Sequence, residues 1–339
     1  MLSLRYPLAL ATLALTAASA SAQLFEEKFG QERVETREFR NAEVRRAAEA
    51  RGGHAHHGHA HAGHDHGAGH DHGIETENLF GFTLGSDTEH AGAKGIALEN
   101  VARFGKRSSS YFGLGQKLEF AFGITDNLSA SVALLGDYHR IKEKPDYAGT
   151  VDNVKARYLF NGFGGEIRYR LLNRQTAPFG LTFHFEPSIA LSDELSGLKG
   201  IKYGSENKII FDREVVKDQL FVAFNLLHEA EVVKERGAEA WERASKVGAS
   251  LAATYQVVPK VFLGAEAKYL RAYDGLSLKA YLGDAWYVGP TLSARFGSNA
   301  WVNVAYNGLV GGRPKGGGAR YDLDNFERHQ LRVKLGFEF

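Results

Sequence analysis

The feature that most constrains the fold is a strict alternation of apolar and polar residues, which is most regular over residues 326–339, FERHQLRVKLGFEF. Counting back by twos from the last residue gives only apolar side chains, namely Phe339, Phe337, Leu335, Val333 and Leu331. Charged, amide and glycine residues fill the positions between them. Because side chains alternate sides along an extended strand, this segment predicts a β-strand with one apolar face and one charged face.

The same alternation recurs along the chain, for example over residues 117–122, 166–171, 179–191 and 286–296. Segments of about ten such residues suit tilted strands that cross a bilayer. A water-soluble sandwich also uses amphipathic strands, but it rarely leaves charges on the opposite face of so many successive strands. Inside lipid every backbone polar group needs a partner, which a closed barrel supplies. The sequence therefore predicts an all-β fold, a single antiparallel transmembrane β-barrel.

The alternation of short and longer connections predicts the number of strands. If the C-terminus lies in the periplasm, the alternating short and longer connections fit an even number of strands, and the count that fits is twelve. Ten strands is the alternative. Residues 205–214 give the weakest strand and are included because the parity fails without them. The predicted strands cover residues 95–105, 111–123, 127–140, 156–171, 178–191, 205–214, 219–234, 244–256, 260–272, 284–297, 299–311 and 326–339. The predicted barrel domain is residues 95–339.

The first 22 residues predict a secretory signal. Arg5 precedes an apolar run over residues 7–18, and Ala20-Ser21-Ala22 suits cleavage before Gln23. A retained anchor is the alternative, but the run is shorter than the roughly 20 residues that span a bilayer. No cysteine is present, which excludes a lipid-anchored cysteine and disulfides, and the net charge of +1 gives no indication of nucleic acid.

Residues 23–53 are rich in Glu, Arg and Ala and end in Gly-Gly. This composition predicts a charged periplasmic helix that stops at the glycines, or partial disorder. A helix that docks on a periplasmic partner or on the barrel mouth is the alternative.

Residues 54–73 form a histidine-rich segment with nine of the fourteen histidines and the repeat AGHDHG. It has no large apolar residue, so we expect it to be disordered without a ligand. Imidazole and carboxylate groups bind Zn²⁺, Cu²⁺ and Ni²⁺, and such binding weakens as the pH falls through about 6.5. The predicted metal ligands are His54, His56, His57, His59, His61, His64, Asp65, His66, His70, Asp71 and His72.

The irregular spacing of these histidines selects no single metal, so it predicts a low-specificity buffer rather than a catalytic zinc site. A solubilising linker, a purification tag and metal binding without a cellular role are the alternatives. No cofactor is required by any other motif.

Residues 74–94 are predicted to connect this segment to the barrel at its mouth. They contain ENLFGFTLGSD (residues 77–87), which is short and glycine-rich for a strand, and we expect it either to enter the barrel mouth or to form an additional edge. Together with GKRSSSYFGLGQKLEFAFGITDNL (residues 105–128), it resembles the N-terminal signature of an uncharacterised family of proteobacterial outer-membrane barrel proteins. The aromatic C-terminal strand likewise resembles the closing strand of bacterial outer-membrane barrels. The resemblance implies a barrel from about Glu77 onward and supplies no catalytic residues.

The sequence favours a protein that is not an enzyme, since it contains no G-x-S-x-G, H-E-x-x-H, P-loop or dinucleotide motif. An outer-membrane hydrolase is a less favoured alternative, with His184 and Glu186 as its most plausible pair. His139, His228 and His329 are interpreted as lumen or loop residues. The predicted lumen-lining residues are Lys117, Glu119, Glu166, Arg168, Arg170, His184, Glu186, Glu266, Lys268, Arg295, Arg332 and Lys334.

These observations predict a channel or transport-related barrel of the bacterial outer membrane, whose periplasmic histidine-rich segment binds or buffers transition metal ions. A non-conducting barrel that anchors a metal-binding arm is the alternative. The expected partners are outer-membrane lipid, transition metal ions and, through the C-terminal strand, the barrel-assembly machinery. Nucleic acid is not expected.

Overall fold

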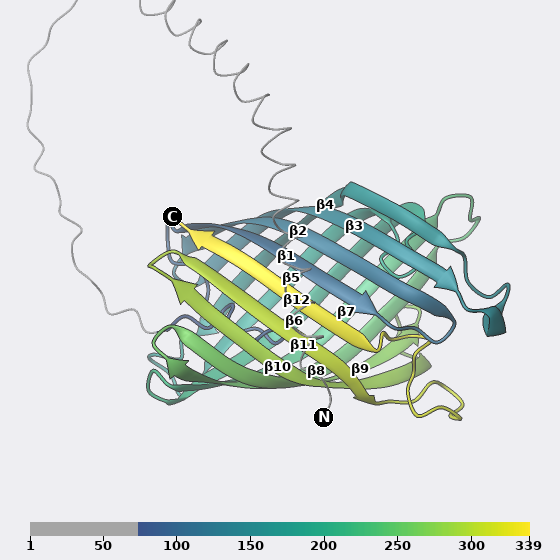
Figure 1. Ribbon diagram of the computed structural model, residues 1–339. Helices are drawn as coiled ribbons and strands as arrows, with labels where there is room; N and C mark the ends of the chain where they lie inside the picture. The colour runs from purple at the N-terminus through teal and green to yellow at the C-terminus, as the bar shows by residue number, and fades with distance from the viewer. Residues whose placement is uncertain (1–73) are drawn as a thin grey trace, which may run out of the picture. The chain divides into compact units, whose positions relative to one another are not determined.

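The computed structural model describes residues 74–339, which form a closed barrel of twelve antiparallel strands (Figure 1). Each strand pairs with its neighbours in sequence, and β1 pairs with β12 to close the ring. The strands are β1 (Lys94–Phe104), β2 (Ser109–Thr125), β3 (Leu128–Glu143), β4 (Val154–Leu172), β5 (Gly180–Ser192), β6 (Lys199–Val216), β7 (Leu220–Glu235), β8 (Glu242–Val258), β9 (Val261–Asp274), β10 (Ala280–Phe296), β11 (Ala300–Gly311) and β12 (His329–Glu338). The predicted twelve-strand barrel is confirmed. The predicted signal, the charged segment of residues 23–53 and the histidine-rich segment lie outside the described residues.

Strand β6 differs most from its prediction, because it has 18 residues where the alternation indicated residues 205–214. Its added part begins at Lys199 and contains Lys202, whose side chain is buried inside the barrel. The residues Lys199, Gly200, Lys202 and Gly204 make this added part resemble a polar, glycine-containing loop in sequence, so the predicted strand began too late.

The connections differ in length at the two ends of the barrel. One end, the short-turn end, carries turns such as residues 126–127 and 259–260, and there Phe339 donates a backbone hydrogen bond to Lys94 at 2.8 Å. The other end, the long-loop end, carries residues 312–328 and the β3–β4 loop with a 3₁₀ helix at Pro145–Tyr147. The start of β1 and the finish of β12 therefore both lie at the short-turn end.

The two surfaces of the barrel have opposite character. Outward side chains are apolar and exposed, including Phe163 at 60%, Val132 at 58% and Leu251 at 58%. Inward side chains are polar and buried, including Arg168 at 2% and Asn303 at 0% exposure. This is the reverse of the arrangement in a water-soluble protein, whose apolar side chains pack inside.

Among residues 74–339, no helix is long and apolar enough to cross a membrane.

Residues 74–91 run inside the barrel, and we call them the N-terminal plug. Phe80 and Thr83 in this segment are completely buried. Thr83 N donates to Glu266 Oε2 at 2.9 Å, and Leu84 N donates to Asn225 Oδ1 at 2.8 Å. The predicted location was the barrel mouth. The segment extends further because inward side chains supply the partners that its backbone groups require in a buried position.

Two apolar clusters lie inside the lumen, one toward each end. Toward the short-turn end, Phe80 of the plug packs with Phe221 of β7 and Phe262 of β9. Toward the long-loop end, Phe326 from the β11–β12 loop packs with Tyr287 of β10. The charged middle of the lumen lies between these two clusters.

Candidate functional site

A cavity of about 370 Å³, which we call the chamber, occupies the middle of the lumen. Phe82 of the plug lines it toward one end, and Glu194 and Phe326 from two long-loop connections line it toward the other. Among the described residues, ten acidic and nine basic side chains line the chamber, so the opposite charges nearly cancel. The chamber therefore suits small polar or charged solutes better than apolar ones.

A narrower cavity of about 30 Å³ runs between the plug and the wall formed by β1, β2 and β3. It shares Glu77, Arg168 and Lys334 with the chamber and is lined by Glu338 near the short-turn end. Its volume is about that of one water molecule.

Ion pairs cover the chamber wall near β2. Lys117 and Glu119 share the inward face because they are two residues apart on one strand. Lys117 Nζ lies 2.8 Å from Glu186 Oε1 on β5, and Lys334 Nζ lies 3.1 Å from Glu119 Oε2. The network therefore links β12, β2 and β5 across the lumen.

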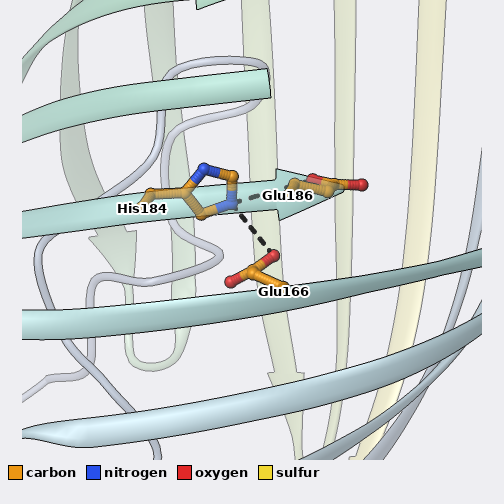
Figure 2. A group of neighbouring side chains, drawn as sticks. All are labelled: Glu166, His184 and Glu186. Carbon is orange, nitrogen blue, oxygen red and sulfur yellow. Dashed lines mark ion pairs between the residues drawn. The ribbon is translucent and has the colours of Figure 1, made fainter. Parts of the chain in front are cut away.

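Glu166, His184 and Glu186 converge on one point of this wall (Figure 2). The Nε2 atom of His184 lies 3.1 Å from Glu166 Oε2 and 3.7 Å from Glu186 Oε2. The register of β4 against β5 places Arg168 directly opposite His184. Glu166 lies two residues before Arg168 on β4 and therefore faces the same side of the strand. Sequence alternation paired His184 with Glu186, whereas Glu166 joins them only through strand register.

The plug is held at its tip by a buried carboxylate. Glu266 on β9 accepts hydrogen bonds from Phe82 N at 3.2 Å and from Thr83 Oγ1 at 3.0 Å, in addition to Thr83 N. Asn307 Nδ2 donates to the same side chain at 3.0 Å. A single side chain from the wall thus satisfies two backbone N–H groups of the plug.

The returning half of the plug is held by charged groups. Arg168 donates to the carbonyl oxygens of Gly85 and Asp87 at 2.6 and 2.8 Å, and Asp212 Oδ2 accepts from Ser86 N at 2.9 Å. Asp87 forms ion pairs with Arg170, at 3.3 Å, and with Arg174. Burial by itself raises the pKa of Asp87, but Arg174 outweighs it and lowers that pKa below its ordinary value.

The structure divides the predicted lumen residues between two roles. Lys117, Glu119, Glu166, Arg168, His184, Glu186, Lys268, Arg332 and Lys334 lie at or beside the chamber or the narrower cavity. Arg170, Glu266 and Arg295 instead contact the plug, the last through an ion pair with Glu75, and Arg168 and Arg332 also bond plug carbonyls. The predicted metal ligands at residues 54–72 lie outside the described residues.

Two histidines interpreted as lumen or loop residues face outward. His228 shares the outer face of β7 with Phe224 and Leu226, and His329 Nδ1 lies 2.6 Å from the hydroxyl of Tyr306. His139 faces inward beside Asp137, at 3.3 Å.

Several site residues were not predicted from the sequence. Glu206 and Lys208 pair at 2.5 Å on the inward face of β6, where continued alternation would have indicated them. Arg174 and Asp212 hold the plug, and Glu99 pairs with Arg332 at 3.0 Å. For Arg174, in a connection outside the strands, no sequence pattern indicated a role.

The family model described as "Family of unknown function (DUF6662)" matches residues 72–339. The chain belongs to this family. The match contains the plug and all twelve strands, and every histidine of the histidine-rich segment except His72 precedes it. A comparison with curated proteins gave no match.

Solved structures similar to this chain include an outer membrane channel from Pseudomonas putida F1, with 11% identity and a TM-score of 0.49 over 75% of this chain and 98% of that one. The translocator domain of the autotransporter NalP from Neisseria meningitidis has 13% identity and a TM-score of 0.44 over 74% and 89% of the two chains. LpxR from Salmonella typhimurium has 10% identity and a TM-score of 0.39 over 72% and 99%. At this level of similarity, the activities of those proteins do not transfer to this chain.

Proposed function

We propose that the protein is a gated channel of the bacterial outer membrane, through which small polar or charged solutes pass when the plug leaves the lumen. The observation that carries this proposal is the chamber of about 370 Å³ with charges of both signs, enclosed by a barrel whose outer surface is apolar. A solvated, charged interior inside an apolar exterior suits a lipid environment and a water-filled path.

The outer surface supports the membrane location. The strands have 10 to 19 residues, and about 9–11 residues suffice for a tilted strand to cross a bilayer. Exposed aromatic side chains lie near both ends of the barrel, such as Phe296 and Phe337 near the short-turn end and Trp241 near the long-loop end. Short turns face the periplasm in such barrels, so the short-turn end is the proposed periplasmic end, and β12 is the proposed contact for the assembly machinery.

The histidine-rich segment is the proposed metal-binding arm of this channel. Ile74, the first described residue, accepts a hydrogen bond from Arg174 in the β4–β5 connection, which belongs to the short-turn end. The chain before residue 74 is therefore tethered to the proposed periplasmic end. Tethering nine histidines there raises the local concentration of Zn²⁺, Cu²⁺ or Ni²⁺ at the lumen entrance.

A non-conducting barrel that anchors this arm is the second candidate. The two apolar clusters favour it, because one includes the plug, the other includes the β11–β12 loop, and they lie toward opposite ends of the lumen. Conduction requires at least the plug to move, so the two candidates differ in a measurable property.

Single-channel conductance of the refolded protein in a planar bilayer separates the candidates. We expect rare openings from the unmodified protein and frequent openings from Glu266→Gln, because the amide cannot accept all the hydrogen bonds that Glu266 receives from the plug. Glu229→Gln is the matched control, since Glu229 is also an inward carboxylate but pairs with Lys246 at 3.0 Å rather than with the plug.

The same recordings with micromolar Zn²⁺, Cu²⁺ or Ni²⁺, before and after deletion of residues 54–72, test the arm. Openings that respond to metal only when the segment is present support a metal-linked channel. If well-folded Glu266→Gln never opens, the channel proposal fails and the anchor is favoured.

A further inference from the structure

We propose that Glu166, His184 and Glu186 form a binding site for one divalent transition metal ion in the lumen wall. The three donor atoms all lie within 4.8 Å of one another. Imidazole nitrogen and carboxylate oxygen are both ordinary ligands of such ions. This site is separate from the histidine-rich segment and does not depend on whether the barrel conducts.

The spacing of the donor atoms fits tetrahedral coordination. Two ligands bound at 2.0–2.1 Å and at the tetrahedral angle lie about 3.3 Å apart. The distances from His184 Nε2 to the two carboxylate oxygens are 3.1 and 3.7 Å, which bracket that value. The two carboxylate oxygens lie within 4.8 Å of each other, so an ion that binds all three atoms would draw them together toward the same spacing.

Each carboxylate has one oxygen free for the ion. Glu186 uses Oε1 to pair with Lys117 at 2.8 Å, and Glu166 directs Oε1 to Arg168 at 3.5 Å. In both residues the oxygen that faces His184 is the other one, Oε2. The two cations thus orient the carboxylates without occupying the ligand positions, as outer-shell partners do around bound metals.

The imidazole of His184 is the second observation. Its side chain is completely buried, Nδ1 has no hydrogen-bond partner among the described residues, and Nε2 points at the carboxylate oxygens of Glu166 and Glu186. A bound ion would take the place of the proton that Nε2 and a carboxylate can share, and it would bind all three groups at once. In Figure 2 the ring directs this nitrogen toward the two carboxylates.

The position of the site leaves one coordination place open. Glu166 and Glu186 both line the chamber, so water or a chamber solute can supply a fourth ligand. Glu206 lies directly opposite Glu186 and Lys208 opposite His184 in the β5–β6 register. These two side chains pair at 2.5 Å, so their charges cancel beside the site.

Zinc titration of the full chain tests the proposal. All nine histidines of residues 54–72 are first replaced by alanine, so that only the lumen site is measured. Calorimetry with Zn²⁺ should then report one ion per chain. Glu166→Gln, His184→Gln and Glu186→Gln should each weaken the affinity by at least about tenfold, since even outer-shell changes have effects of that size.

His139→Gln and His228→Gln are the controls, because they remove an inward and an outward imidazole at other places, and both should leave the affinity unchanged. Circular dichroism confirms that each variant is folded. A second measurement uses the chain in which Glu166, His184 and Glu186 are unchanged, so it does not depend on whether a lumen variant folds. The absorption bands of Co²⁺ bound to this chain should indicate tetrahedral coordination. Absence of Zn²⁺ binding, or binding that persists in folded His184→Gln, would overturn the proposal and leave His184 as a neighbour of two carboxylates only. Neither result bears on conductance.

Discussion

At the scale of single residues, the plug carries carboxyl groups whose pKa values are shifted in opposite directions. Burial raises the pKa of Glu77 to about 7, with Arg168 opposing the rise, and burial together with the charge of Glu77 raises the pKa of Glu89 to about 8. The docked plug thus favours protonated Glu77 and Glu89 but ionised Asp87. For the first two, docking weakens as the pH rises from their ordinary values to the raised ones, whereas for Asp87 it weakens as the pH falls below its ordinary value.

Docking of the plug should therefore weaken between pH 6 and pH 9. The chain has no cysteine, so Asn78→Cys introduces a single thiol in the plug. We expect its labelling rate, normalised to the unfolded chain at the same pH, to rise by at least about tenfold over this range. Glu77→Gln with Glu89→Gln should remove most of the rise. If the labelling rate of that double variant rose with pH as steeply as before, other groups would control docking.

At the scale of elements, alternation predicted most of the strands because the inward or outward direction of a strand residue is a local property, and the parity of the connections added residues 205–214. The place of the plug is not local. Its partners Asp212, Asn225 and Glu266 lie between 126 and 184 residues away in the sequence. The same reason explains the metal cluster, in which alternation paired His184 with Glu186 but only the register of β4 against β5 adds Glu166. Local patterns therefore predicted the barrel and its polar lining, and long-range pairing determined the site.

The packing of β12 against β11 gives a prediction at this scale. A Cβ atom added to Gly336 would lie 2.2 Å from the ring of Trp301, which is in register with it. Gly336→Ala should therefore lower the free energy of unfolding by about 1–3 kcal/mol through overpacking. Gly308→Ala on β11 is the control, because its nearest neighbour would be 3.5 Å away. Denaturant unfolding in detergent measures both, and equal stability of the two variants would contradict the steric argument.

At the scale of the whole molecule, the lumen is obstructed at two levels. Phe80 belongs to the apolar cluster toward the short-turn end and Phe326 to the cluster toward the long-loop end, with the chamber between them. Two constrictions along one path act in series, so their resistances add. When the two are comparably narrow, opening either one alone leaves the other to limit the current.

Conductance should therefore respond non-additively to truncation of these two side chains. We expect Phe80→Ala and Phe326→Ala each to raise the mean current only slightly, and the double variant to raise it by more than the sum of the two. Leu251→Ala, on the outward face, controls for the loss of an apolar side chain. If Phe80→Ala alone gave the full current, the long-loop end would be open already.

The plug enters and leaves the lumen at one rim. Ile74 is bonded to Arg174 in the β4–β5 connection, and Ala91 N donates to Asp126 in the β2–β3 turn at 3.1 Å. A looped segment of this kind can be withdrawn while the ring stays closed. Tension applied to the plug at residue 74 would load the contacts of the plug one after another, beginning with those of Ile74 and Glu75. The mechanical work of extraction is then spread along the loop, so a weak but sustained pull at the short-turn end would suffice where a sudden push through the barrel would not.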